Sequence, residues 1–157
     1  MKQAAQRVQR ALEANGLNCR VVELPASTRT SVEAATAIGC EVAQIAKSIV
    51  FRGVTSGRAV IVIASGSNHV NEAVVADAAG EPIARADASW VKERVGYVIG
   101  GVPPVGHLGD PRVFFDPDLL HFETVWSAAG TPHAVFEVAP ADLLKASRGE
   151  VLGKSRL

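Results

Sequence analysis

Lys47 is the residue whose type and surroundings first suggest chemistry. It lies in segment 44–51, QIAKSIVF, whose apolar content is typical of a buried β-strand. Alternate side chains of a strand share a face, so Lys47 lies beside Ile45, Ile49 and Phe51. An ammonium among apolar neighbours loses hydration unless it finds a partner or a cavity, which makes it a candidate for a functional site. The pattern also fits a lysine whose stem covers apolar surface while its head reaches water, and both interpretations stay open.

A second candidate is the loop GGVPP at residues 100–104. The adjacent glycines Gly100 and Gly101 let the backbone adopt unusual dihedral angles and approach a ligand closely. Such a loop can present N–H groups to an oxyanion or a carbonyl oxygen, while the two prolines stiffen its exit. A tight connection between two elements would have the same composition.

Two further loops follow apolar strand segments. Ser65 opens the loop SGSNH at 65–69, and Gly130 and Thr131 lie in AAGTP at 128–132. Loops at strand ends often build sites, although the same residues are ordinary turn formers. Ser48 and Ser65 carry hydroxyl groups that could order a water molecule or bind an amino group.

Several familiar chemistries have no motif in this chain. It has neither G-x-G-x-x-G nor a P-loop, no G-x-S-x-G, and no H-x-x-x-H pair among its four histidines. Cys19 and Cys40 are far apart and lack metal-ligand spacing, which favours free thiols. The histidine and cysteine spacings therefore argue against a metal site.

The elements that must position these residues are short and alternate in type. The periodicity and the turn residues predict helices over 2–14, 31–38, 72–79 and 88–94 and a last helix from residue 140. They predict strands over 20–24, 44–51, 59–64, 113–115, 123–127 and 134–138. The expected fold class is mixed α/β, with an irregular, mixed, partly closed sheet surrounded by short helices. The two strands that are apolar on both faces, 44–51 and 59–64, are expected in its centre.

Length and charge narrow the function classes. The 157 residues predict a single domain over 1–157, with a polar tail from about residue 149 that frays. Lys+Arg and Asp+Glu balance at 16 each, and the basic residues are scattered. This argues against a protein that grips long DNA or RNA by its phosphates, but not against one that touches the end of an RNA. The N-terminus has no apolar signal core and no segment is long enough to span a membrane, so we expect a cytoplasmic protein.

Five motifs in order along the chain resemble the YbaK/EbsC family of aminoacyl-tRNA deacylases. They are TxxEAA at 30–35, QIxKSIVF at 44–51, VxASG at 62–66, GYxxGGVPPxGH at 96–107 and VWxAxGTP at 125–132. The chain is similar to free-standing homologues of the editing insertion of bacterial prolyl-tRNA synthetase, and within them to the ProXp-x subgroup. Ser48 stands where cysteine-specific members carry threonine, which puts the subgroup in doubt.

The resemblance implies a function and a site. Family members hydrolyse mischarged tRNA, mainly tRNA(Pro) carrying a small wrong amino acid such as alanine, 2-aminobutyrate, serine, threonine or cysteine. It implies catalytic roles for Lys47, Gly100 and Gly101, without a cofactor. The expected substrate contacts are Ser48, Ser65, Val102, Pro104, Gly130 and Thr131. The expected partners are the acceptor end of a mischarged tRNA and a prolyl-tRNA synthetase.

Three other functions remain open at this stage. A non-catalytic module could bind the aminoacylated 3′ end of tRNA through the same residues. A lysine-dependent enzyme could form a Schiff base through Lys47. A DNA-binding regulator is disfavoured by the scattered, balanced charge.

Overall fold

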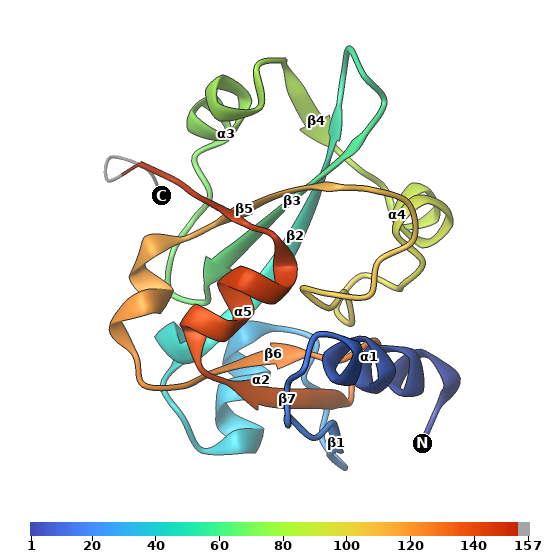
Figure 1. Cartoon of the computed structure of the whole chain (residues 1–157), viewed down its shortest axis with the longest axis vertical. Helices are drawn as coiled ribbons and strands as arrows, with labels where there is room; N and C mark the ends of the chain where they lie inside the picture. Colours follow the sequence, from blue (N-terminus) through green and yellow to red (C-terminus); the bar gives the residue numbers. More distant parts are fainter. Residues whose placement is uncertain (154–157) are drawn as a thin grey trace.

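The computed structural model describes residues 1–153 and has short helices around one mixed sheet (Figure 1). The helices are α1 (Gln3–Ala14), α2 (Ser31–Ile38), α3 (Glu72–Ala79), α4 (Ala88–Val95) and α5 (Pro140–Ser147), with 3-10 turns η1 (Val42–Gln44) and η2 (Pro117–His121). The strands are β1 (Val22–Glu23), β2 (Ile45–Gly53), β3 (Ala59–Ser65), β4 (Ile83–Arg85), β5 (Arg112–Phe115), β6 (Val125–Ala128), β7 (Ala134–Val138) and β8 (Glu150–Val151). The predicted mixed fold with short helices is confirmed.

The hairpin of β2 and β3 forms the centre of the sheet. In the described residues the strand order is β1-β7-β6-β2-β3-β5-β8, and β4 pairs with β2 beside that path. The antiparallel register places Lys47 opposite Ala64 and Phe51 opposite Val60. All seven residues of β3 are buried, as expected for a strand that is apolar on both faces.

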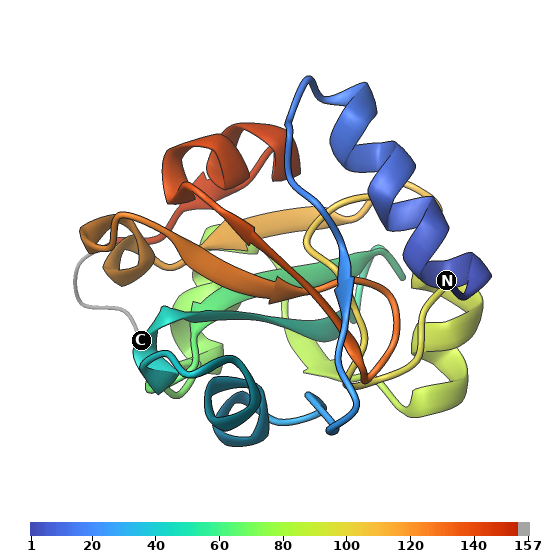
Figure 2. The same ribbon diagram turned by 90° about the horizontal axis from the view of Figure 1, so that it is seen from below.

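Helices pack on both sides of the sheet (Figures 1 and 2). The buried apolar side chains of the described residues form three clusters. The largest contains buried residues of α1, α4 and α5 together with alternate residues of β3, such as Ile61 and Ile63. The intervening residues Val60 and Val62 belong to a second cluster with Val75 of α3. The third is small and lies between α2 and the start of β2. Since successive strand residues face opposite sides, the central strand β3 is covered on both faces.

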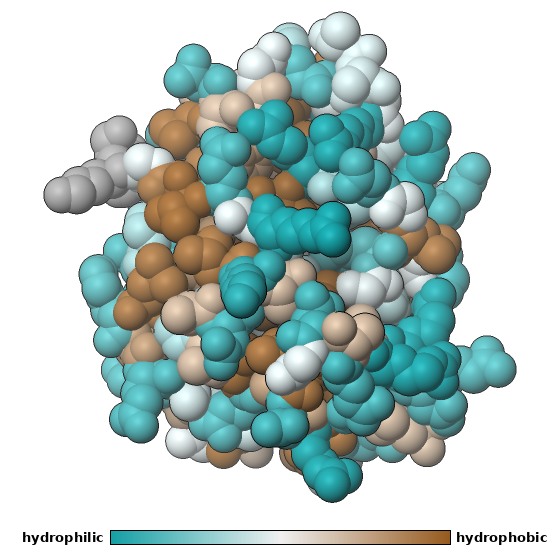
Figure 3. All heavy atoms as spheres, in the orientation of Figure 1, coloured by the Kyte–Doolittle hydropathy of each residue, from teal (hydrophilic) through white to brown (hydrophobic). Residues whose placement is uncertain are grey.

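Figure 3 shows a face of the molecule that mixes hydrophilic and apolar atoms. The apolar atoms gather on the left of this view, where β5 and α5 lie in Figure 1. Val151 and Leu120 are among the large apolar side chains that remain exposed.

The helix limits follow from local capping chemistry. The Thr30 hydroxyl accepts from the Glu33 amide at 3.1 Å and the Glu33 carboxylate accepts from the Thr30 amide, which forms a capping box at the start of α2. Gly39 ends α2 in the left-handed conformation, with φ of 88°. The Asp87 side chain accepts from the Trp90 amide and caps α4.

The C-terminal segment differs from its prediction. Glu150 and Val151 pair in parallel with Phe114 and Phe115, and the side chain of Leu152 is buried. The expectation of a frayed tail is therefore wrong for 150–152, because Leu152 gains apolar contacts that its polar neighbours concealed. The rest of that prediction concerns 154–157, which lie outside the described residues. The sequence analysis also missed β4, a three-residue strand whose partners are far along the chain.

The sheet has a gap along one edge of its central strand. On the side opposite β3, strand β2 pairs with β6 only at Ile45 and Ala46, and with β4 only from Phe51 onward. Residues 47–50 therefore have a strand partner on one side only. The unpaired edge of this central strand leaves its backbone N–H and C=O groups accessible to a ligand.

Candidate functional site

A cavity of about 440 Å³ lies beside the unpaired stretch of β2. Its wall includes residues 45–50, the segment that enters α2, residues of the 96–107 loop and the strand β6. The volume falls within the range of about 300–1,000 Å³ that is typical of small-molecule sites. Of the residues predicted from the sequence, four line this cavity: Lys47, Ser48, Gly100 and Val102.

Lys47 is half-buried, and its ammonium is held by a backbone carbonyl. Its Nζ donates to the carbonyl oxygen of Asn68 at 2.8 Å. Burial lowers the pKa of Lys47 below its ordinary value of 10.5, while the negative charge of Asp116 opposes that shift. An ammonium has three N–H donors, so this single hydrogen bond leaves two for a ligand.

Asp116 organises the loop that holds Lys47, and the sequence analysis missed it. Its carboxylate is buried, with 1% of the residue exposed. One oxygen accepts from the Ser65 amide at 2.9 Å and from the Asn68 side-chain amide at 2.8 Å, and the other accepts from the Asp118 amide at 2.9 Å. Its position directly after the predicted strand 113–115 was the available signal, because acidic residues at the ends of buried strands often serve sites.

The hydroxyl of Ser48 is the one buried side-chain polar atom without a hydrogen-bond partner among residues 1–153. A buried hydroxyl without a partner costs about 1–3 kcal/mol, so such a group calls for an explanation. Since Ser48 also lines the cavity, a ligand there could supply the missing partner. Ser65 differs, because its hydroxyl donates to the Ala43 carbonyl at 2.7 Å and it does not line the cavity.

The two adjacent glycines have different roles. Gly100 lines the cavity with φ of 91°, a conformation that other residues rarely adopt. Within residues 1–153, the amides of Gly100 and Val102 donate no hydrogen bond. The Gly101 amide is instead engaged, donating to the Val98 carbonyl at 3.0 Å. The N–H groups available to a ligand are therefore those of Gly100 and Val102.

The Gly101 backbone joins this loop to the turn between β6 and β7. The Gly130 amide donates to the Gly101 carbonyl at 2.8 Å. A Cβ atom at Gly101 would lie 2.8 Å from the backbone of Thr131, so only glycine fits. Thr131 and Pro104 are buried and, like Gly130, do not line the cavity. The structure thus places Gly101, Pro104, Gly130 and Thr131 behind the wall rather than on its surface.

Contacts from α1 fix the other end of the loop. The Arg7 guanidinium donates to the Gly96 carbonyl at 2.9 Å and stacks over the Tyr97 ring at 4.7 Å. The Tyr97 hydroxyl in turn donates to the Gly106 carbonyl at 2.8 Å. The loop is thereby held at both ends before any ligand binds.

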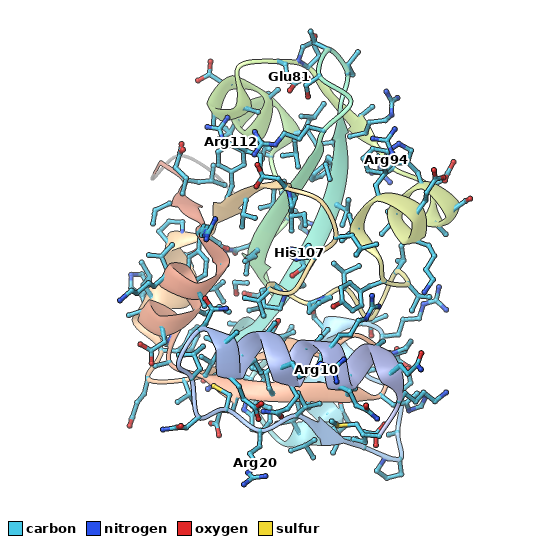
Figure 4. All side chains as sticks on the ribbon, turned by 45° about the vertical axis from the view of Figure 1, so that its right-hand side comes forward. Arg10, Arg20, Glu81, Arg94, His107 and Arg112 are labelled. Carbon is cyan, nitrogen blue, oxygen red and sulfur yellow. The ribbon has the colours of Figure 1, made fainter. Side chains whose placement is uncertain are left out.

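His107, labelled in Figure 4, braces the same loop from within. Its Nε2 lies 2.6 Å from the Pro103 carbonyl oxygen. A carbonyl only accepts, so Nε2 must carry the hydrogen of this bond. Burial lowers the pKa of His107 below 6.5, which favours the neutral ring.

Other kinds of site were also sought in the described residues. No group of three His, Cys, Asp or Glu side chains in 1–153 lies close enough to hold a metal ion. In the same residues, no helix combines the length and the apolar character needed to cross a membrane.

Comparison with known proteins agrees with this geometry. The aminoacyl-tRNA editing domain profile matches residues 25–146. The chain is 45% identical to a candidate trans-editing enzyme for prolyl-tRNA synthetase of known structure, with a TM-score of 0.90 and 96% of each chain covered. It is 30% identical to the hypothetical protein APE2540, with a TM-score of 0.85 and coverage of 92% of this chain and 96% of that one. It is also 32% identical to the uncharacterized protein YwhH of Bacillus subtilis (strain 168), over 83% of each chain.

The fold and the profile together define the class. The chain belongs to the aminoacyl-tRNA editing domain family. This confirms the resemblance seen in the five motifs, each of which contributes at least one residue to the cavity wall.

Proposed function

We propose that this protein is a trans-editing deacylase that hydrolyses the ester of tRNA(Pro) carrying a small amino acid other than proline. The observation that carries the proposal is that four residues with suitable groups line one cavity: Lys47 with its ammonium, Gly100 and Val102 with amides that donate no hydrogen bond, and Ser48 with an unpartnered hydroxyl. All four are of the kind that binds a carboxylic ester and its oxyanion.

The reaction is the addition of water to the ester carbonyl carbon. The carbonyl oxygen becomes an oxyanion, the carbon–oxygen bond to the ribose then breaks, and the ribose oxygen takes up a proton. The products are the free amino acid and the uncharged tRNA. In this proposal the amides of Gly100 and Val102, which donate no hydrogen bond within residues 1–153, donate to the oxyanion, each contributing about 3 kcal/mol.

Lys47 contributes positive charge beside the developing oxyanion. Its hydrogen bond to Asn68 fixes the ammonium at the cavity wall, so little reorganisation accompanies the reaction. The charge repels the ammonium of the amino acid, which therefore lies on the far side of the ester from Lys47. The Ser48 hydroxyl can accept a hydrogen bond from that amino group or from the attacking water.

The size of the cavity bears on selectivity. We expected a small pocket, but about 440 Å³ is far more than a side chain such as that of alanine needs. The cavity therefore holds the terminal adenosine as well, and only its inner part selects the amino acid. Apolar walls distinguish one methylene by only about 1–3 kcal/mol, so exclusion of the larger proline ring is the more effective sieve.

The cellular setting follows from the proposed substrate. The partner is the acceptor end of a mischarged tRNA, and a prolyl-tRNA synthetase would supply that substrate in the cytoplasm. The balanced charge of the chain favours weak contact with the body of the tRNA, because such contact depends on neutralised phosphates.

Deacylation assays test the proposal directly. Purified protein is incubated with tRNA(Pro) charged in turn with alanine, 2-aminobutyrate, serine, threonine, cysteine and proline. Fast loss of one or more small amino acids, with prolyl-tRNA spared, is the expected result. Binding of all these tRNAs without turnover would instead identify a non-catalytic module for the 3′ end.

A further inference from the structure

The charged residues that line the cavity are both cations. Arg29 and Lys47 contribute to its wall, and no aspartate or glutamate does. The whole chain has a formal net charge of zero, so this local excess is not a consequence of a basic protein. A cavity lined by like charges attracts a ligand of opposite charge. Neither an amino acid ester nor adenosine carries a negative charge, so the rest of the substrate must supply it.

Arg29 lies at the mouth of the cavity, against the catalytic loop. A Cβ atom placed on Gly100 would lie 2.5 Å from Cγ of Arg29, so the arginine stem packs on the bare glycine backbone. The segment holding Arg29 is ordered by its own amide, which donates to the Ser27 hydroxyl at 3.2 Å, and by the capping box that begins at Thr30. The contact with Gly100 and the ordered backbone therefore restrict the orientation of the Arg29 side-chain stem.

The Arg29 guanidinium has no intramolecular role in the described residues. It is exposed, and within 1–153 it forms neither a hydrogen bond nor an ion pair. Arg7, Arg58 and Arg112 differ in this respect, since each binds a carbonyl or a carboxylate, and the unpaired Arg20 does not line the cavity. All five N–H donors of Arg29 are free for a ligand.

We propose that Arg29 binds the phosphodiester group that precedes the terminal adenosine of the tRNA, an inference that rests on the proposed function. A guanidinium offers paired N–H donors whose spacing matches two phosphate oxygens. Lys47, whose ammonium donates to the Asn68 carbonyl oxygen, contacts the ester in the proposed mechanism. The two cations therefore bind different groups of the substrate, Lys47 the ester and Arg29 the phosphodiester. Arg29 thereby places the ester opposite Gly100, on which its own stem rests.

The test uses the dinucleotide CpA, which has one phosphodiester group, and adenosine, which has none. Dissociation constants are measured by NMR titration for the wild-type protein, Arg29→Ala and Arg29→Lys. Arg20→Ala is the matched control, because Arg20 is exposed, does not line the cavity and points away from the molecule (Figure 4).

The expected result separates the two ligands. Arg29→Ala weakens CpA binding about 5- to 10-fold, as the loss of a charge-assisted contact predicts, and leaves adenosine binding unchanged. Arg29→Lys has a smaller effect, because it keeps the charge and loses the paired donors. Rising salt concentration should weaken CpA binding to the wild type more than to Arg29→Ala, because added ions screen the contact between charges, and Arg20→Ala matches the wild type.

Two results would overturn the inference. One is a wild-type protein that binds CpA no more tightly than adenosine, and the other is an Arg29→Ala variant that weakens both ligands equally. Failure of the proposed function is a separate result: a protein that binds CpA through Arg29 but deacylates none of the charged tRNAs.

Discussion

The Nζ atom of Lys47 lies 2.8 Å from the backbone carbonyl oxygen of Asn68. The lysine is thus held by a neutral carbonyl rather than by a carboxylate, and it keeps its full charge for a ligand. The carboxylate in this network, Asp116, lies one step further away and binds the Asn68 side chain. This arrangement fixes the ammonium without neutralising it, which is what stabilisation of an oxyanion requires.

Replacement of Lys47 by alanine is expected to abolish most of the deacylation. The variant should lose at least about 100-fold in kcat/KM, because one preorganised cationic donor is removed from the oxyanion. The fold should survive, since burial of this lysine is itself unfavourable. Initial rates on alanyl-tRNA(Pro) and thermal unfolding measure the two effects.

The exposed Lys92 of α4 provides the control for that variant, because it does not line the cavity. Lys92→Ala should retain wild-type turnover. Equal activity of Lys47→Ala and the wild type would remove Lys47 from the mechanism.

The pH dependence of activity should report the charge of Asp116. Activity that needs protonated Lys47 is lost as the pH rises through the pKa of Lys47, which burial already places below 10.5. Asp116→Asn removes the negative charge that raises this pKa, so the pKa falls further. The alkaline limb of kcat/KM, corrected for spontaneous ester hydrolysis, should therefore move to lower pH.

Asp116→Asn should also cost stability. An asparagine has one acceptor oxygen where the carboxylate has two, so at least one of the three donors loses its partner, at a cost of about 1–3 kcal/mol. Asp118→Asn is the matched control, because Asp118 also accepts from Asn68 but is exposed. If the alkaline limb of kcat/KM moved equally in Asp116→Asn and Asp118→Asn, the charge that raises the pKa of Lys47 would not be specific to Asp116.

Alanine substitutions should distinguish the two loop glycines. Gly101→Ala places a methyl group 2.8 Å from the Thr131 backbone, and we expect a loss of about 1–3 kcal/mol together with a displaced loop and reduced kcat. Gly100→Ala places alanine in a left-handed backbone conformation, and its methyl group contacts the Arg29 stem. The stem is flexible and can move away, so the backbone conformation is the main cost.

Gly57, in the turn between β2 and β3, measures the free-energy cost of placing alanine in a left-handed backbone conformation without any steric contact. It has φ of 71°, and a methyl group there meets nothing within 4 Å. Gly57→Ala should therefore lose about 1 kcal/mol by chemical denaturation and keep full activity. A Gly101→Ala variant as stable as the wild type would show that the loop and the Thr131 turn separate easily.

The N-caps of two helices allow a comparison between stability and binding. Thr30→Ala and Asn71→Ala each remove a side chain that caps a helix, α2 and α3 respectively, and each should cost about 1 kcal/mol. Thr30 lines the cavity, whereas Asn71 does not. Only Thr30→Ala should raise KM for the charged tRNA, by roughly 2- to 5-fold for a weakened contact. A KM change of the same size in both variants would mean that stability alone is responsible.

Local patterns predicted much of this architecture. The capping box at Thr30 and the glycine at 39 gave the limits of α2, and the apolar runs gave the central hairpin of β2 and β3. The strands β4 and β8 were missed because two or three residues carry too little pattern, and their pairing depends on distant partners. Leu152 shows how one buried side chain can order a tail that looks polar.

The candidate site was predictable by residue type but not by arrangement. Lys47 and Gly100 were found from composition and motif, and both line the cavity. The supporting place of Gly130 became visible only in three dimensions, because its amide donates to the carbonyl of Gly101, far away along the chain. The engaged amide of Gly101 depends on a local turn to Val98 that residue types alone do not specify. Asp116 was missed because its role passes through Asn68 rather than through a sequence neighbour.

The gap beside β2 also divides the hydrogen-bonded sheet into two parts. In the described part of the chain, only two residue pairs, Ile45–Trp126 and Ala46–Ser127, join β6 and its neighbours to the remaining strands. Lys47 lies on one side of this seam, while the loop of Gly100 is tied to the other side through Gly101 and Gly130. A substrate that contacts both Lys47 and Gly100 would therefore bridge the two parts of the sheet.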